Sequence, residues 1–234
     1  MIGGKPIERI GEGFKEQSFQ FLGHHLDENL TWSHHMGHLH KKLVSANFAL
    51  SRSKSFLPRR ILKSIYRSLF ESHLHFGSIV LGCAKPRYLH KLEVQQKKAV
   101  RHIFNQRYNS HTAETFKELG YLRVDDLVSL NQSIFARNYS NHKLPGSFKN
   151  LLSPVPDRGV RRTRDDDYNF SQMPLKYADL HHFPVPKMVS TWNSLPLTIK
   201  SVSDLSDFRS DLKAHFLSKY ETVCDLINCF SCNY

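Results

Sequence analysis

The sequence of 234 residues lacks several features that define common classes of protein. Its longest uncharged apolar run, residues 76–84, has about half the length that a membrane-spanning helix needs. Four cysteines, three of them in the last eleven positions, do not make a disulfide framework. The first residues also lack the basic and then apolar pattern of a secretory signal. These absences predict an intracellular protein, nuclear or cytoplasmic, that is neither secreted nor membrane-bound.

Acidic residues are scarce in one part of the chain. The whole sequence has 33 Lys and Arg against 21 Asp and Glu, a formal net charge of +12. Residues 33–110 contain 15 of these basic residues, 8 of the 15 histidines, and only two acids, Glu71 and Glu93. The other residues are nearly balanced, with 18 basic against 19 acidic side chains. Such a regional excess indicates an anionic partner, which is either a nucleic acid or a membrane surface.

The apolar residues of the basic region repeat with the period of an α-helix. After Ser33, a candidate N-cap, the spacing predicts a first helix whose apolar stripe contains Met36, Leu39, Leu43, Ala46 and Leu50. Forty per cent of the chain is apolar, which is enough to build a core. Successive amphipathic helices can bury their stripes against one another, which favours a nucleic acid over lipid as the partner.

Two further helices are predicted to carry basic residues opposite their apolar side. Pro58 suits the first turn of one, and the break at Pro86 precedes the other. Lys and Arg neutralise phosphates and release their counterions. The first helix has Ile61, Leu62, Ile65 and Leu69 on one side and Arg60, Lys63 and Arg67 on the other; the second has Leu89, Leu92, Ala99 and Ile103 opposite Lys91, Lys98 and Arg101. We predict that these six basic residues bind a nucleic-acid backbone.

The remaining segments complete a mainly α fold. Residues 18–23 alternate apolar and polar side chains and end at a glycine, which predicts a small N-terminal β-hairpin. Helices are expected over 112–119 and 124–139, joined at Gly120, and over 204–220 with Ser203 as a candidate cap. Six prolines between 141 and 190 predict a long, mostly irregular segment.

The C-terminal tail contains residue types that bind zinc. Cys224, Cys229 and Cys232, with His215 upstream, supply enough sulfur and nitrogen for a tetrahedral Zn²⁺ site. Free thiols in a frayed tail are the alternative interpretation. No spacing identifies a catalytic triad or a phosphate-binding glycine loop.

Residues 177–180, Tyr-Ala-Asp-Leu, are similar to the Tyr-Ala-Asp-Asp turn of polymerases. In that turn two adjacent carboxylates hold the divalent metals. The second carboxylate is missing here, and the stretch lies in the proline-rich segment. We therefore interpret this match as a coincidence.

Several short stretches occur in an order that resembles a known family. They are Phe21-Leu22-Gly23, Leu30-Thr31-Trp32, His35 to Leu39, Leu57-Pro58, Ile65-Tyr66, Gln95 to Arg101, His111-Thr112 and Trp192 to Pro196, followed by Phe208 to Tyr220. Together they resemble the C-terminal part of the reverse transcriptase, an RNA-directed DNA polymerase, of LINE-type, non-LTR retrotransposons of the jockey-like group. The resemblance runs from about residue 18 to the C-terminus. One departure is Leu81-Gly82, where the family usually has Trp-Gly.

The resemblance implies three regions. Residues 1–32 would be the end of the palm domain, 33–110 a basic helical thumb-like domain, and 111–234 a C-terminal helical and proline-rich region. By position, Phe21, Leu22 and Gly23 would take the primer-grip role. The palm, with its Mg²⁺ ligands, and the fingers would precede this chain and be its protein partners, so no cofactor except zinc is expected here.

The function implied by this resemblance is that of a primer-template binding fragment. It would hold RNA and DNA, chiefly the backbone of an RNA–DNA hybrid, and would not polymerise alone. The alternative, from another class, is a stand-alone helical protein-interaction module derived from a retroelement. A complete enzyme would instead show Mg²⁺-dependent nucleotide incorporation, which we do not expect.

Overall fold

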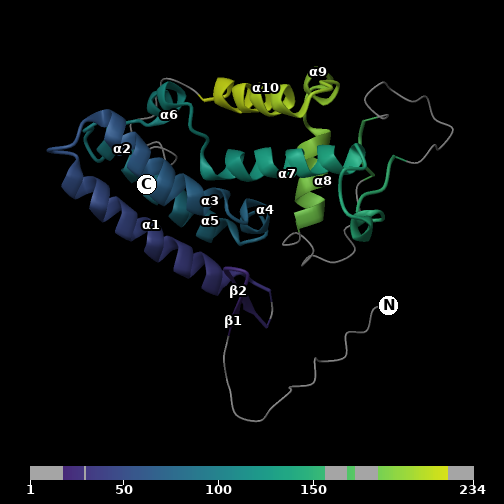
Figure 1. The fold of residues 1–234 in the computed structure, drawn as a ribbon, viewed down its shortest axis with the longest axis horizontal. Helices are drawn as coiled ribbons and strands as arrows, with labels where there is room; N and C mark the ends of the chain where they lie inside the picture. The colour runs from purple at the N-terminus through teal and green to yellow at the C-terminus, as the bar shows by residue number, and fades with distance from the viewer. Residues whose placement is uncertain (1–17, 29, 156–167, 172–183, 221–234) are drawn as a thin grey trace, which may run out of the picture.

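The computed structural model describes residues 18–28, 30–155, 168–171 and 184–220. It confirms a mainly helical fold with a small two-stranded antiparallel hairpin at the N-terminal side (Figure 1). Its elements are β1 Ser18–Phe21, β2 His24–Asp27, α1 Ser33–Ser53, α2 Arg59–Tyr66, the π-helical turn η1 Arg67–Glu71, α3 Ser72–His75, α4 Ser78–Leu81, α5 Pro86–Ile103, α6 Ala113–Leu119, α7 Val124–Ser140, the 3-10 turn η2 Gly146–Phe148, α8 Pro184–Asn193, α9 Leu197–Lys200 and α10 Leu205–Ser218.

The hairpin has the tight turn that its sequence suggests. Ser18 pairs with Asp27 and Phe21 with His24, so only Leu22 and Gly23 connect the strands. Both connecting residues have positive φ, 45° and 83°. A two-residue turn of this hand matches the twist of the strands, and glycine adopts such a φ without steric cost.

The first predicted helix is confirmed as α1, and its five predicted apolar residues are all buried. The predicted cap was wrong. Trp32, with φ of 61°, occupies the N-cap position, and Ser33 is already helical. The Ser33 hydroxyl accepts a hydrogen bond from the Thr31 hydroxyl at 3.1 Å, so it makes no capping bond to the helix backbone.

The second basic helix buries a different stripe from the predicted one. Ile61 and Leu69 are exposed, and Ile65 is only partly buried. The buried residues follow Leu62 at intervals of four. In an α-helix, with 3.6 residues per turn, residues four apart lie successively further around the helix axis. The π turn at η1 contains more residues per turn, which brings the later residues back to the same side. The buried stripe consists of Leu62, Tyr66, Phe70 and Leu74.

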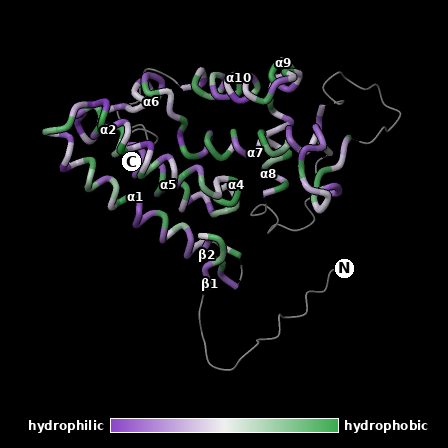
Figure 2. Tube along the Cα trace, in the orientation of Figure 1, coloured by the Kyte–Doolittle hydropathy of each residue, from purple (hydrophilic) through white to green (hydrophobic). Residues whose placement is uncertain are grey.

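One hydrophobic core runs through the described chain. α1 packs along α5, and α7 contacts α4, α8 and α10 (Figure 1). Figure 2 shows hydrophobic residues recurring along these helices with hydrophilic residues between them. The predicted apolar residues of α5 are buried, and Gly120 ends α6 with a φ of 64°. The division of the chain at Ser110 stays a prediction, although both sides contribute to this core.

The C-terminal part contains more helix than expected. The segment predicted to be irregular up to residue 190 contains α8, which begins at Pro184. Proline is tolerated in a first helical turn, where its missing N–H is not needed. The predicted cap of α10 was wrong by one residue, because the Asp204 carboxylate accepts from the backbone N–H groups of Ser206 and Asp207 at 2.6 and 3.2 Å. None of the described helices is long and apolar enough to cross a membrane.

Candidate nucleic-acid interface

Five of the six predicted backbone-binding residues reach the surface. Arg60, Arg67, Lys91 and Lys98 are exposed, and Lys63 is partly exposed. Arg101 contradicts the prediction: it is 6% exposed, and its Nε donates to the Ser110 carbonyl at 2.9 Å. The loop after α5 folds back over this side chain. Arg101 therefore stabilises the chain reversal and cannot lie against a partner's backbone.

Two of the surface cations lie where α5 packs on α1. Lys91 and Lys98 are close enough to His40 of α1 to lower its pKa, in addition to the larger effect of burial. His102 has its pKa lowered by burial, by Lys54 at the end of α1 and by Lys98. We call Lys54, Lys91 and Lys98, with His40 and His102, the α1–α5 face.

Burial and the lysines both disfavour the charged form of the two histidines of the α1–α5 face and lower their pKa values. His40 is also within hydrogen-bond reach of α5, with its Nε2 3.3 Å from Gln95 Nε2. The nearby Asn47 amide donates to the Gln95 backbone carbonyl at 2.9 Å. These contacts fix the two helices side by side. The lysine positions are therefore set by rigid elements.

Other basic residues gather around the turn between α6 and α7. The Arg67 guanidinium lies 6.0 Å from the centroid of the Tyr121 ring. Lys213 of α10 reaches the same turn, since a Cβ at Gly120 would be 4.0 Å from its Nζ. A cavity of about 130 Å³ between these elements is lined in part by Tyr66, Tyr121, Arg209 and Lys213.

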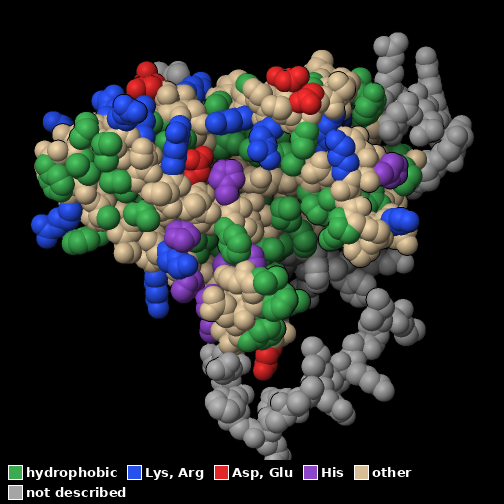
Figure 3. Space-filling model, viewed as in Figure 1, with side chains coloured by type: hydrophobic (Ala, Val, Ile, Leu, Met, Phe, Trp, Pro, Cys, Tyr) green, Lys and Arg blue, Asp and Glu red, His purple; other side chains and the backbone are tan. Residues whose placement is uncertain are grey.

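We call Arg60, Lys63, Arg67, Arg209 and Lys213 the α2–α10 face. Figure 3 shows Lys and Arg side chains spread across the molecule from α2 towards α10, with acidic side chains among them, and Glu71 lines the same cavity as Arg209 and Lys213. Arg209 and Lys213 were missed from the sequence because the C-terminal region is neutral overall. Their spacing of four, off the stripe of Phe208 and Leu212, is the signal that could have found them.

Several cations are engaged in internal contacts. Lys97 is 1% exposed and forms a 3.0 Å ion pair with Glu93, which explains one of the two acids of the basic region. Arg59 lies over the Phe104 ring at 4.3 Å and 3.7 Å from Glu118. Such residues support the fold. The surface charge available to a partner is therefore smaller than the sequence total suggests.

The predicted primer-grip residues lie at the tip of the hairpin. Phe21 is 58% and Leu22 77% exposed. Gly23 faces the Phe76 ring, from which a Cβ at this position would be 3.1 Å away. The tip therefore presents apolar side chains to its surroundings, and the assigned role stays a prediction.

The predicted zinc site falls largely outside the described residues. Cys224, Cys229 and Cys232 are not among them. The Tyr-Ala-Asp-Leu stretch at residues 177–180 also lies outside the described residues. His215 is half-buried on α10, with its ring 5.8 Å from that of Phe216. Within the described ranges, no three Cys, His, Asp or Glu residues are placed to hold a metal ion. Zinc in the tail stays a prediction.

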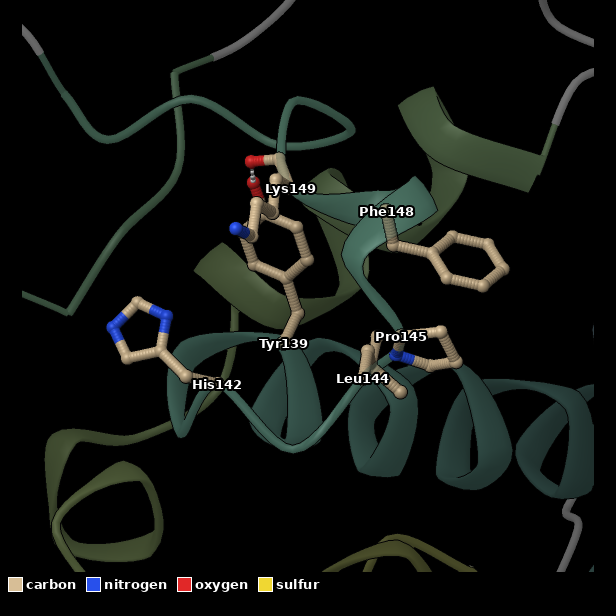
Figure 4. Close-up of a pocket in the computed structure, with 6 residues that line it drawn as sticks. All are labelled: Tyr139, His142, Leu144, Pro145, Phe148 and Lys149. Atoms are coloured by element: carbon tan, nitrogen blue, oxygen red, sulfur yellow. Dashed lines mark hydrogen bonds between the residues drawn. The ribbon is translucent and has the colours of Figure 1, made fainter.

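An open, mainly apolar pocket of about 390 Å³ follows the end of α7 (Figure 4). Tyr139 stands in it, with its hydroxyl 2.6 Å from the Lys149 carbonyl. His142, Leu144, Pro145 and Phe148 complete the lining, with His142 and Phe148 on opposite sides of Tyr139 in this view. The described residues that line this pocket include no Ser, Cys or carboxylate.

Comparison with known protein families, with curated proteins and with solved structures finds no match for this chain. Its chemistry is therefore interpreted from its own residues.

Proposed function

We propose that this chain binds the sugar-phosphate backbone of a nucleic-acid duplex, and an RNA–DNA hybrid in particular. The observation that supports this most is the charge of residues 33–110, where 15 basic residues accompany two acids. Glu93 is paired with Lys97. Glu71 lies 3.7 Å from His75. The exposed lysines of the α1–α5 face thus have no acidic counterpart in the basic region to neutralise them.

The geometry suits contact with phosphates rather than with bases. Lys91 and Lys98 are seven residues apart on α5, which is a rise of about 10 Å. The phosphates of one strand rise by ~3.4 Å per nucleotide along the axis of B-form DNA, so two lysines aligned with that axis would cover a rise of about three nucleotides. Lysine binds phosphate as a point charge without reading a base edge. Binding would therefore be independent of sequence.

The proposed family is that of LINE-type reverse transcriptases, on the strength of the ordered stretches in the sequence. The basic helices would act as the thumb, and Phe21, Leu22 and Gly23 would support the primer end. Polymerisation needs the Mg²⁺-binding carboxylates of a palm, which the resemblance assigns to a region preceding this one. We expect this chain to bind template and primer but to incorporate no nucleotide by itself.

The test is fluorescence anisotropy with a short labelled RNA–DNA hybrid, in salt from about 50 to 200 mM. One variant reverses the α1–α5 face, Lys91→Glu with Lys98→Glu. A second reverses the α2–α10 face, Arg60→Glu with Arg67→Glu. The matched control is Lys149→Glu, an exposed lysine outside both faces. Circular dichroism of each variant checks that the helices are retained.

Affinity should decrease as salt rises, and the slope of log affinity against log salt should become less negative by about 0.9 for each phosphate contact removed. The control should keep the wild-type slope. Wild-type affinity that does not depend on salt would refute the proposal. If only one face changes the slope, that face alone is the interface.

A protein-interaction module is the second candidate. The observation that favours it is the pair of apolar side chains on the outer side of α1, Val44 at 43% and Phe48 at 64% exposed. The Arg52 guanidinium lies 5.3 Å from the Phe48 ring centroid. The protein-interaction module replaces the duplex-binding function under two conditions. The wild-type chain must have negligible affinity for the RNA–DNA hybrid, and Phe48→Ser must abolish pull-down of a cellular protein that the wild type binds.

A further inference from the structure

Five histidines lie where the hairpin meets the helical body. His24 and His25 belong to β2, His35 and His38 to α1, and His73 to α3. The ring centroids of His24 and His35 are 4.9 Å apart, and those of His25 and His38 are 4.6 Å apart. His35 is at the centre, 5% exposed, with His25 6.3 Å away on its other side. We call these five residues the histidine cluster.

The charged groups that shift the pKa values of the cluster are all basic. Burial lowers the pKa of His35 most, and the neighbouring His24, His25, His38 and Lys42 lower it further, to about 4. The pKa of His38 is lowered by burial and then by His25, Lys42, Lys41 and His73. His24 and His73 also have lowered pKa values, chiefly through burial. Among the described residues, a proton added to this cluster would therefore meet repulsion from basic groups; the carboxylates nearest in sequence, Asp27 and Glu71, are not among the groups that shift these pKa values.

The hydrogen-bonding environment of the cluster also disfavours protonation. Within the described structure, His24 Nδ1, His25 Nε2 and His35 Nδ1 are buried and have no hydrogen-bond partner. A neutral imidazole can leave its acceptor nitrogen unpaired at modest cost. Protonation would convert that nitrogen into a charged donor that has nothing to bond, which costs much more.

The cluster also attaches the hairpin to the body. The His24 ring stacks on Phe76, with centroids 4.8 Å apart and planes at 9°. It covers Gly77 so closely that a Cβ there would overlap His24 Cε1. A hairpin of two four-residue strands is marginal alone. Its docked position thus depends on these ring contacts.

We propose that the hairpin is a pH-sensitive element: it is docked on α1 and α3 through neutral imidazoles near neutral pH, and protonation of the histidine cluster releases it in mild acid.

The direction of the pH effect follows from the linkage between proton binding and release of the hairpin. A released histidine regains an ordinary pKa of about 6.5, so the released state binds more protons below that pH and is favoured there. For His35 alone, with a docked pKa of about 4, the ratio of released to docked hairpin rises about thirty-fold between pH 7.5 and 5. His24, His38 and His73, whose pKa values are also lowered, would add to this change.

The experiment is amide hydrogen exchange of the full chain, read by mass spectrometry at about pH 7.5 and about pH 5, with EDTA present and intrinsic rates corrected. Peptides from residues 18–28 report on the hairpin, and peptides from α5 serve as the internal reference. The test variant is His35→Phe, which keeps a ring but binds no proton. The matched control is His34→Phe, its exposed neighbour in sequence.

We expect protection of residues 18–28 to fall at least about tenfold in the wild type and in His34→Phe, while α5 is unchanged. His35→Phe should keep the hairpin protected in acid. If His35→Phe does not fold, His24→Phe provides the same test, because Phe can stack on Phe76. Hairpin protection that does not change with pH, or that falls as far in His35→Phe (or in His24→Phe, if that variant replaces it) as in the wild type, overturns the proposal. This outcome is independent of any nucleic-acid affinity.

Discussion

α5 and α7 are the two long helices near the centre of the core, and they differ in what they show to solvent. Both bury a full apolar side, with Leu92 and Val100 on α5 and Leu127 and Val128 on α7 all at most 5% exposed. α5 has five basic residues and one acid, whereas α7 has one arginine and two aspartates in its first turn.

The buried side and the solvated side of these helices are determined by different requirements. Packing fixes the buried side in the same way on both, since any well-filled core requires it. It does not require Lys91 and Lys98, because a solvated side can have either sign or a mixture. Lys97 and Arg101 are buried and support the fold, so the exposed Lys91 and Lys98 call for an explanation outside it, and a polyanionic partner provides one.

The largest effects should come from the cores of the two helices and should be alike. Leu92→Ala and Leu127→Ala each remove a buried side chain and leave a cavity, which costs about 2–5 kcal/mol. Urea denaturation followed by circular dichroism measures this. A cost below about 1 kcal/mol for only one of them would show that the two helices do not share one cooperative core.

The next effect concerns the contact between α4 and α7. A Cβ at Gly82 would lie 2.6 Å from Gln132 Nε2 and 2.7 Å from Val128 Cγ1, so Gly82→Ala should cost about 1–3 kcal/mol through overpacking. Gly37→Ala is the matched control. A Cβ at this position in α1 meets nothing within 4 Å, so the change should stabilise the protein by about 0.5–1 kcal/mol. Equal melting temperatures for both variants would contradict this packing.

A smaller effect is expected at the start of α7. The Tyr220 hydroxyl accepts from the Arg123 N–H at 2.8 Å and donates to Asp126 Oδ2 at 2.6 Å. Tyr220→Phe should therefore cost about 1 kcal/mol at neutral pH.

The cost of Tyr220→Phe should depend on pH. Burial raises the pKa of Asp126, and the Tyr220 hydroxyl partly offsets this. Removing the hydroxyl raises the pKa further, which penalises the ionised form only. The cost should therefore shrink as pH falls and Asp126 becomes protonated. Denaturation at about pH 7 and about pH 4 measures both values, and a larger cost in acid would contradict the assignment.

The smallest effect on stability should come from the charged side of α5. Lys98→Met should change the free energy of unfolding by less than about 0.5 kcal/mol, since Lys98 is exposed. The same change should lower the salt slope of hybrid binding by about 0.9. Asn138→Met on α7 is the control and should alter neither quantity. An unchanged slope for Lys98→Met would remove this residue from the interface.

Much of the fold could be predicted from the sequence because helix periodicity is local. The spacing from Met36 to Leu50 and the glycine at 120 identified α1 and the end of α6 correctly. The stripe of α2 was predicted wrongly because Tyr66 and Phe70 follow a π turn, which period counting does not anticipate. The helix at Pro184 was missed because proline was interpreted as a breaker, although it fits a first turn.

The candidate interface was only half predictable. Lys91 and Lys98 were placed correctly, because residues opposite a buried stripe must face solvent. Arg101 also lies opposite the predicted apolar stripe, yet its side chain is buried and bonded to the Ser110 carbonyl in the loop after α5. Arg209 and Lys213 join the α2–α10 face from the far end of the chain, where the local charge is balanced. Such long-range proximity has no signature in a single sequence.

The sequence by itself determined the helical periods, the hairpin turn and the concentration of positive charge in residues 33–110. These depend on neighbours within a few positions or on composition. Only the tertiary structure decided which cations remain exposed, which of them share a face, and that five histidines from three elements meet under the hairpin. The physical reason is that burial and proximity arise when distant segments pack together, and both then set the pKa and the accessibility of each side chain.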